Sequence, residues 1–169
     1  MEITELSRSD AERLRNALPA DVATGLKEAF VDEERNLERG RPWALSESER
    51  MYFAVSRDGA AYLFIGINPS PPNAINISSF ARIVPAPKGH AGMCLKAFIE
   101  TKLVPMCRET QKEAIAAHAT ARGQGVFERL KLSPPRGIKT IQSRGPIWTL
   151  FLAERAPSDP DPGSSGAWR

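Results

Sequence analysis

Two apolar runs with the alternation typical of β-strands, Met51–Val55 and Ala61–Ile67, are separated by the turn segment Arg57–Gly59. Its Asp-Gly pair tolerates the positive φ values of a tight turn, so the two runs predict a β-hairpin. The prolines within Asn68–Asn73 lack amide donors and cannot continue a ladder, so the second strand must end in a loop there. A third strand is expected over Ile75–Val84. These segments predict a mainly antiparallel sheet in the middle of the chain.

Helical patterns precede this sheet. A short strand is expected at Ile3–Leu6, followed by a helix opened by a capping box of Ser9 and Glu12. A second helix is expected over Val22–Leu37, where apolar residues recur at helical spacing among charged ones.

The second half of the chain alternates helix and strand. A helix with an apolar stripe from Leu95 to Met106 is expected to kink or end at Pro105. The remaining elements are a strand, a short helix and a closing hairpin, over Ala114–Thr120, Arg122–Leu130, Lys139–Gln142 and Ile147–Ala153. The predicted order is β-α-α-β-β-β-α-β-α-β-β. This order indicates an α/β fold of the α+β type, with a mixed, mostly antiparallel central sheet flanked by helices.

Size and composition limit the classes of function. The chain has 169 residues, of which 41% are hydrophobic and 25% charged, so we expect one domain over residues 1–155. Residues 156–169 are rich in Pro, Asp, Gly and Ser and predict a flexible tail, in which Trp168 has no assigned role. The net charge of +3 is scattered, and no run of like charges suggests nucleic-acid binding.

Two cysteines, Cys94 and Cys107, are about 20 Å apart along one helical segment, which is too far for a disulfide. With two histidines they give no metal-ligand spacing, so no metal site is predicted.

Neither a signal peptide nor a run of about 20 apolar residues is present, which favours a cytoplasmic protein without a membrane contact.

One loop carries the strongest chemical signal. The segment from Ile83 to Met93 lies between a predicted strand and a predicted helix and contains Gly89 and Gly92. Free amides at a helix N-terminus, with the positive end of its dipole, suit a pyrophosphate, and Lys88 adds a positive charge. An ordinary strand-to-helix connector has the same composition, so the pattern alone leaves both interpretations open.

This loop resembles the coenzyme A signature of the GNAT acyltransferase superfamily, Val-x-Pro-x-x-Arg/Gln-x-x-Gly-x-Gly/Ala. Ile83 takes the valine place, Pro85 the proline place and Lys88 the Arg/Gln place, whereas Ala91 and Met93 replace the two glycines. The predicted element order is similar to that of the superfamily over about residues 1–153. A later segment, Ala119–Leu132, is similar to a second family motif.

The resemblance implies that acetyl-coenzyme A or another acyl-coenzyme A binds where the strand Ile75–Val84 separates from the strand Ala114–Thr120. The implied cofactor-binding residues are Ile83, Val84, Lys88, Gly89, His90, Ala91, Gly92 and Met93. The amine acceptor, on a small molecule or a protein, would enter near the first two helices and the loop Asn68–Asn73. The protein would act as a monomer or a homodimer.

The catalytic candidates are few. His118 lies on the strand Ala114–Thr120, which would line the gap between the two separated strands. An imidazole with an ordinary pKa near 6.5 suits a general base. Ser78 and Ser79 alternate along a strand, so one of them should face inward. Phe127 takes the place of the tyrosine that in many family members protonates the leaving thiolate, and phenylalanine cannot do so.

The sequence therefore leaves three candidate functions. The first is an acyl-coenzyme A-dependent N-acyltransferase, with acetyl as the expected group. The alternative, which Phe127 favours, is a catalytically inactive module of the same fold that binds a ligand or a protein. A third is a synthase that takes its acyl group from an acyl-carrier protein.

Overall fold

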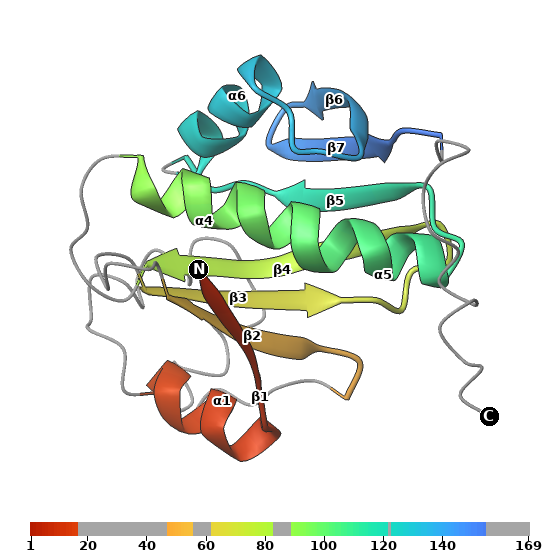
Figure 1. Cartoon of the computed structure of the whole chain (residues 1–169). Coiled ribbons are helices and arrows are strands. Elements are labelled where there is room, and N and C mark those ends of the chain that lie inside the picture. The colour runs from red at the N-terminus through yellow and green to blue at the C-terminus, as the bar shows by residue number, and fades with distance from the viewer. Residues whose placement is uncertain (17–46, 56–61, 83–88, 122, 155–169) are drawn as a thin grey trace.

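The computed structural model describes residues 1–16, 47–55, 62–82, 89–121 and 123–154 (Figure 1). The strands are β1 (Glu2–Leu6), β2 (Arg50–Val55), β3 (Tyr62–Asn68), β4 (Ala74–Arg82), β5 (Ala114–His118), β6 (Ile138–Arg144) and β7 (Ile147–Leu152). The helices are α1 (Arg8–Asn16), α4 (His90–Phe98), α5 (Val104–Glu109) and α6 (Gln124–Leu132), with a π-helical turn at Ile99–Leu103. The observed order follows the predicted order throughout the described residues.

The strands form one sheet in the order β1-β2-β3-β4-β5-β7-β6. Neighbouring strands are antiparallel except for β4 and β5, which are parallel. The predicted mixed, mostly antiparallel sheet flanked by helices is confirmed.

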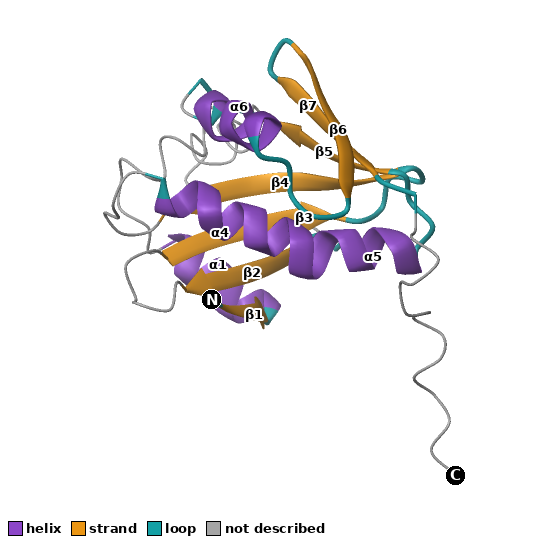
Figure 2. Ribbon diagram, turned by 45° about the horizontal axis from the view of Figure 1, so that its top comes forward, coloured by secondary structure: helices purple, strands orange, loops and turns teal. Residues whose placement is uncertain are grey.

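Helices cover both faces of the sheet. Adjacent residues of β2 point to opposite faces, as alternation along a strand requires. Tyr52 packs edge-on against Phe98 of α4, with 5.1 Å between ring centroids, whereas Met51 packs against Ala11 of α1. Figure 2 shows α4 and α5 along one face and α1 behind the other. We call these the α4 face and the α1 face.

The long helix after β4 does not break at Pro105. The structure has a π-helical turn over Ile99–Leu103 instead, and the Val104 N–H donates to the Ile99 carbonyl five residues back. Pro105 occupies the first turn of α5, where its missing N–H is tolerated more readily. The widened turn thus lets one helix run past a proline.

Two local details differ from the sequence-based expectations. The first helix is capped by Ser7 rather than Ser9: the Asp10 N–H donates to the Ser7 hydroxyl at 3.2 Å, and that hydroxyl donates to the Asp10 carboxylate at 2.8 Å. The last hairpin turns at Gly145 and Pro146, with Gly145 at a φ of 61°, whereas the strands predicted at Lys139–Gln142 and Ile147–Ala153 left a four-residue turn between them. A two-residue turn of this kind lengthens β6 to Arg144.

The second helix, the turn at Arg57–Gly59 and the tail at 156–169 lie outside the described residues. None of the described helices is long and apolar enough to cross a membrane.

Both cysteines lie in the core and neither forms a disulfide. Cys107 is fully buried, and its thiol lies 3.6 Å from the Ala114 carbonyl, to which it donates. Burial raises the pKa of Cys107 to about 11, although nearby Lys112 and a backbone hydrogen bond at Ile75 oppose the shift. Cys107 is therefore a structural thiol and not a nucleophile at neutral pH.

The Cys107 thiol makes stability depend on pH at the alkaline end. The pKa of Cys107 rises from 9.0 in the unfolded chain to about 11 in the fold. The stability that the buried thiol contributes is therefore complete below pH 9 and is lost as pH rises through 11. We expect the free energy of unfolding to fall over this window by up to about 2–3 kcal/mol more in the wild type than in Cys107→Ala. Urea unfolding at pH 8 and pH 10.5 measures the difference; parallel losses in the two proteins would contradict the assignment.

Candidate functional site

Strands β4 and β5 pair along only part of their length. The parallel register joins Ala74–Ile77 to Ala114–Ala117 and then stops, although β4 continues to Arg82. Beyond this point the facing edges of the two strands form no ladder with each other. Unpaired N–H and C=O groups of a strand edge are available to an extended ligand. The separation implied by the sequence resemblance is present in the fold.

A β-bulge marks the position where the two strands separate. Ile67 of β3 pairs with Ile77, but Gly66 pairs with Ser79, so Ser78 is an additional residue on β4. Bulges bend the strand that carries them and increase its twist. The parallel pairing ends at Ile77, directly before the bulge, and β5 itself ends at His118, one residue after its last paired residue.

The bulge needs a glycine on the neighbouring strand. A Cβ atom at Gly66 would lie 2.3 Å from the Ser79 hydroxyl, 2.9 Å from the Ser78 hydroxyl and 2.7 Å from the Met51 sulfur. Both serine side chains therefore lie over Gly66, on the same face of the sheet. The expectation that Ser78 and Ser79 alternate between faces is wrong, because the extra residue breaks the period of two.

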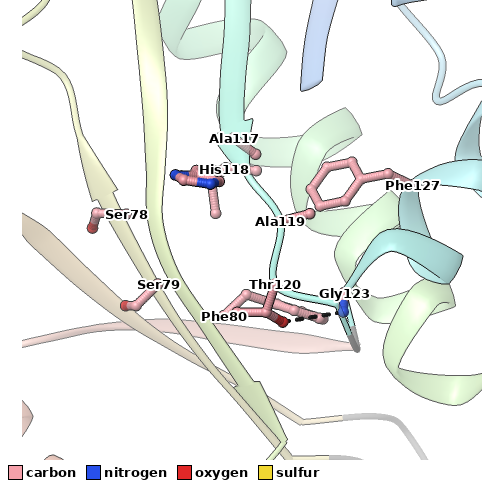
Figure 3. Close-up of a pocket in the computed structure, with 10 residues that line it drawn as sticks. Ser78, Ser79, Phe80, Ala117, His118, Ala119, Thr120, Gly123 and Phe127 are labelled. Carbon is pink, nitrogen blue, oxygen red and sulfur yellow. Dashed lines mark hydrogen bonds between the residues drawn. The ribbon is translucent and has the colours of Figure 1, made fainter. Parts of the chain in front are cut away.

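A pocket of about 60 Å³ opens where β4 and β5 separate (Figure 3). Its lining comes from β4, the end of β5 and the start of α6, and consists of Ile77, Ser78, Ser79, Phe80, Ala117, His118, Ala119, Thr120, Gly123 and Phe127. The lining has one polar and one apolar side. In Figure 3, Ser78 and Ser79 lie on the β4 side, whereas Phe127 lies beyond β5.

The apolar side is held rigidly. Phe127 is 4% exposed and stacks on Trp148 with 5.6 Å between ring centroids. The Trp148 indole N–H donates to the Gln124 side-chain oxygen at 2.8 Å, and the Gln124 amide donates to the Ala119 carbonyl at 3.3 Å. This chain of contacts joins α6 to the end of β5. Sequence reasoning singled out Phe127 but missed Gln124, whose role depends on Trp148, 24 residues further along the chain.

His118 is the predicted catalytic residue that the structure brings into the pocket. It is the last residue of β5, it is exposed, and Figure 3 shows its imidazole between β5 and β4. Alternation along β5 buries its neighbours Ala117 and Ala119 and leaves the imidazole accessible. The position fits a group that exchanges a proton with a bound molecule.

The predicted cofactor loop lies at a strand-to-helix connection, as expected. Gly89 precedes α4 with φ 94° and ψ −22°, and His90, Ala91, Gly92 and Met93 form the first turn. Among the described residues, no side chain caps this helix. Ile83, Val84 and Lys88 lie outside the described residues, so the loop is represented only by its helical half.

Within the described part of the chain, no three His, Cys, Asp or Glu side chains gather as metal ligands. His90 is absent from the pocket lining and belongs to the helix start instead. The described candidates thus fall into two places, the pocket and the N-terminus of α4.

Comparison with known proteins supports the fold. No protein-family model matches the chain, and no curated protein matches its sequence. Among solved structures, Tetrahymena GCN5 matches with a TM-score of 0.52 at 9% identity, over 92% of this chain and 99% of that one. An acetyltransferase from Streptococcus agalactiae matches with a TM-score of 0.51 at 11% identity, over 89% and 98%. Together with the strand order and the separation of β4 from β5, these matches show that the chain has the GNAT acetyltransferase fold.

Proposed function

We propose that this protein transfers an acyl group, with acetyl the expected one, from coenzyme A to an amine. The observation that carries the proposal is the pocket at the separation of β4 and β5, with His118 on its wall, in a chain of this fold. The two buried thiols, neither in a disulfide, support a reducing cytoplasm as the site of the reaction.

The described residues fit an acyl-coenzyme A. The unpaired edge of β4 beyond Ile77 suits the amide groups of an extended pantetheine arm, which would pair with it as an added strand. The uncapped N-terminus of α4, at His90–Gly92, suits the pyrophosphate, since its amides have no partner within the helix. Lys88, adjacent in sequence, supplies a positive charge.

The pocket residues have separate tasks in such a transfer. The amine nitrogen bonds to the acyl carbon, the carbon–sulfur bond breaks, and the thiolate leaves. His118 takes the proton that the nitrogen loses, because its imidazole is accessible from the pocket. Phe127 has no hydroxyl, so the thiolate takes its proton from water. The apolar ring instead excludes water from one side of the acyl group.

Because Phe127 lacks the hydroxyl that would protonate the thiolate, a non-catalytic binding module is the second candidate function. The two functions differ in one observable, the release of free coenzyme A. Acyl-carrier-protein donors, the third candidate, would be distinguished by donor preference.

Acetyl-coenzyme A should stabilise the protein through the N-terminus of α4. At ligand 100-fold above its dissociation constant, the gain is about 2.7 kcal/mol, a shift of a few degrees in Tm. We expect Gly89→Ala to weaken this shift, since φ 94° strains any other residue and disturbs the helix start. Lys88→Glu should weaken it further by adding a like charge to the phosphate site.

Gly145→Ala is the matched control, because Gly145 also has a positive φ and open space around it but lies in the β6–β7 turn. It should lower the Tm without changing the ligand-induced shift. Absence of any shift in the wild type at millimolar acetyl-coenzyme A would contradict the proposal.

His118→Gln should separate binding from turnover. We expect release of coenzyme A, in the presence of a primary amine such as a polyamine, an aminoglycoside or a lysine peptide, to fall by about 10²-fold or more. The affinity for acetyl-coenzyme A should stay within about twofold, because His118 is outside the predicted phosphate site. Turnover retained in the variant would exclude His118 as the base.

A further inference from the structure

Two of the serines that line the pocket have hydroxyls without a hydrogen-bond partner in the described part of the chain. The Oγ atoms of Ser78 and Ser79 are buried, and neither has a hydrogen-bond partner among the residues that the structure describes. Buried polar groups are nearly always paired, and an unpaired one destabilises the folded protein. Two such groups side by side indicate that their partner is a ligand.

The backbone brings these hydroxyls together. Without the bulge, Ser78 and Ser79 would point to opposite faces of β4; with it, both lie within 3 Å of the position that a Gly66 Cβ would take. Gly66 pairs with Met51, which packs against Ala11 of α1. The hydroxyl pair therefore belongs to the α1 face of the sheet, opposite the face that α4 covers.

This placement divides the pocket chemically. Ala117, Ala119 and Phe127 form an apolar wall suited to the methyl group and sulfur of a thioester. Ser78, Ser79 and His118 form a polar wall suited to a nucleophile that carries protons. The α1 face is also the side from which the acceptor is expected.

We propose, on the basis of the acyltransferase function above, that the Ser78 and Ser79 hydroxyls hold the amino group of the acceptor and select a primary amine. A primary amine has two N–H groups and one lone pair. Each hydroxyl oxygen accepts one N–H, and the lone pair stays directed at the acyl carbon. The incoming ammonium gives its third proton to water before it binds, and His118, whose imidazole lines the same pocket, takes the proton that the nitrogen loses when it bonds to the acyl carbon. A secondary amine would leave one hydroxyl unpaired and is disfavoured.

A matched pair of coenzyme A analogues tests this assignment without a known acceptor. S-carbamoylmethyl-coenzyme A presents an NH₂ group where the acceptor nitrogen would lie, and S-acetonyl-coenzyme A presents a methyl group of similar size. Isothermal titration calorimetry gives the affinity ratio of the two. We expect the wild type to prefer the carbamoyl analogue about tenfold, the value of one or two net hydrogen bonds.

In the Ser78→Ala/Ser79→Ala double variant the preference should fall close to one, while the affinity for the acetonyl analogue stays unchanged. Each single variant should lose part of the preference. Ser143→Ala, an exposed serine on β6, is the control and should keep it. Because the two hydroxyls lack protein partners in the described part of the chain, the double variant should melt at least as high as the wild type.

The outcomes separate the two proposals. A wild type that binds both analogues equally, or a double variant that keeps the preference, would overturn the role of the serines while leaving acyl-coenzyme A binding intact. Failure to bind either analogue or acetyl-coenzyme A would overturn the proposed function and the serine assignment with it.

Discussion

The close approach of β4 to Gly66 is the constraint on which the site depends. Without a side chain at Gly66, the strand can accommodate the extra residue Ser78, and this bulge directly follows Ile77, the last residue of β4 that pairs with β5. The bulge groups two hydroxyls on one face, and together with the end of β5 at His118 it leaves the unpaired strand edge and the pocket. A regular strand in the same position would place Ser78 and Ser79 on opposite faces, and the two hydroxyls would not meet.

The rest of the architecture keeps this opening from collapsing. Trp148 of β7, which pairs with Ala117 of β5, is buried, stacks on Phe127 and donates a hydrogen bond to Gln124, so α6 is fixed on one side of the pocket. On the α4 face, Phe98 and Tyr52 fix the helix whose N-terminus would receive the phosphates. Both sets of contacts belong to one core cluster, so the core stays continuous where the strands separate.

The sequence predicted the parts of this structure that depend on local pattern. Alternation and helical spacing identified β1 to β7 and the helices of the described residues to within a few positions, because these periods follow from backbone geometry. The bulge escaped prediction, since two adjacent serines look the same in a regular strand and in a bulged one. Gly66 within an apolar run was the available signal, as glycine inside a strand marks a bulge or a close approach. The role of Gln124 depends on its tertiary contact with Trp148, which has no local signature.

The central claim is that the open edge of β4 receives an extended acyl donor. Hydrogen–deuterium exchange with mass spectrometry, with and without acetyl-coenzyme A, tests it directly. The account predicts slower exchange in the peptide covering residues 78–82 and at the start of α4, with β1 and β2 unchanged as internal references. Protection spread evenly over the sheet, or absent from residues 78–82 when the ligand is bound, would contradict it.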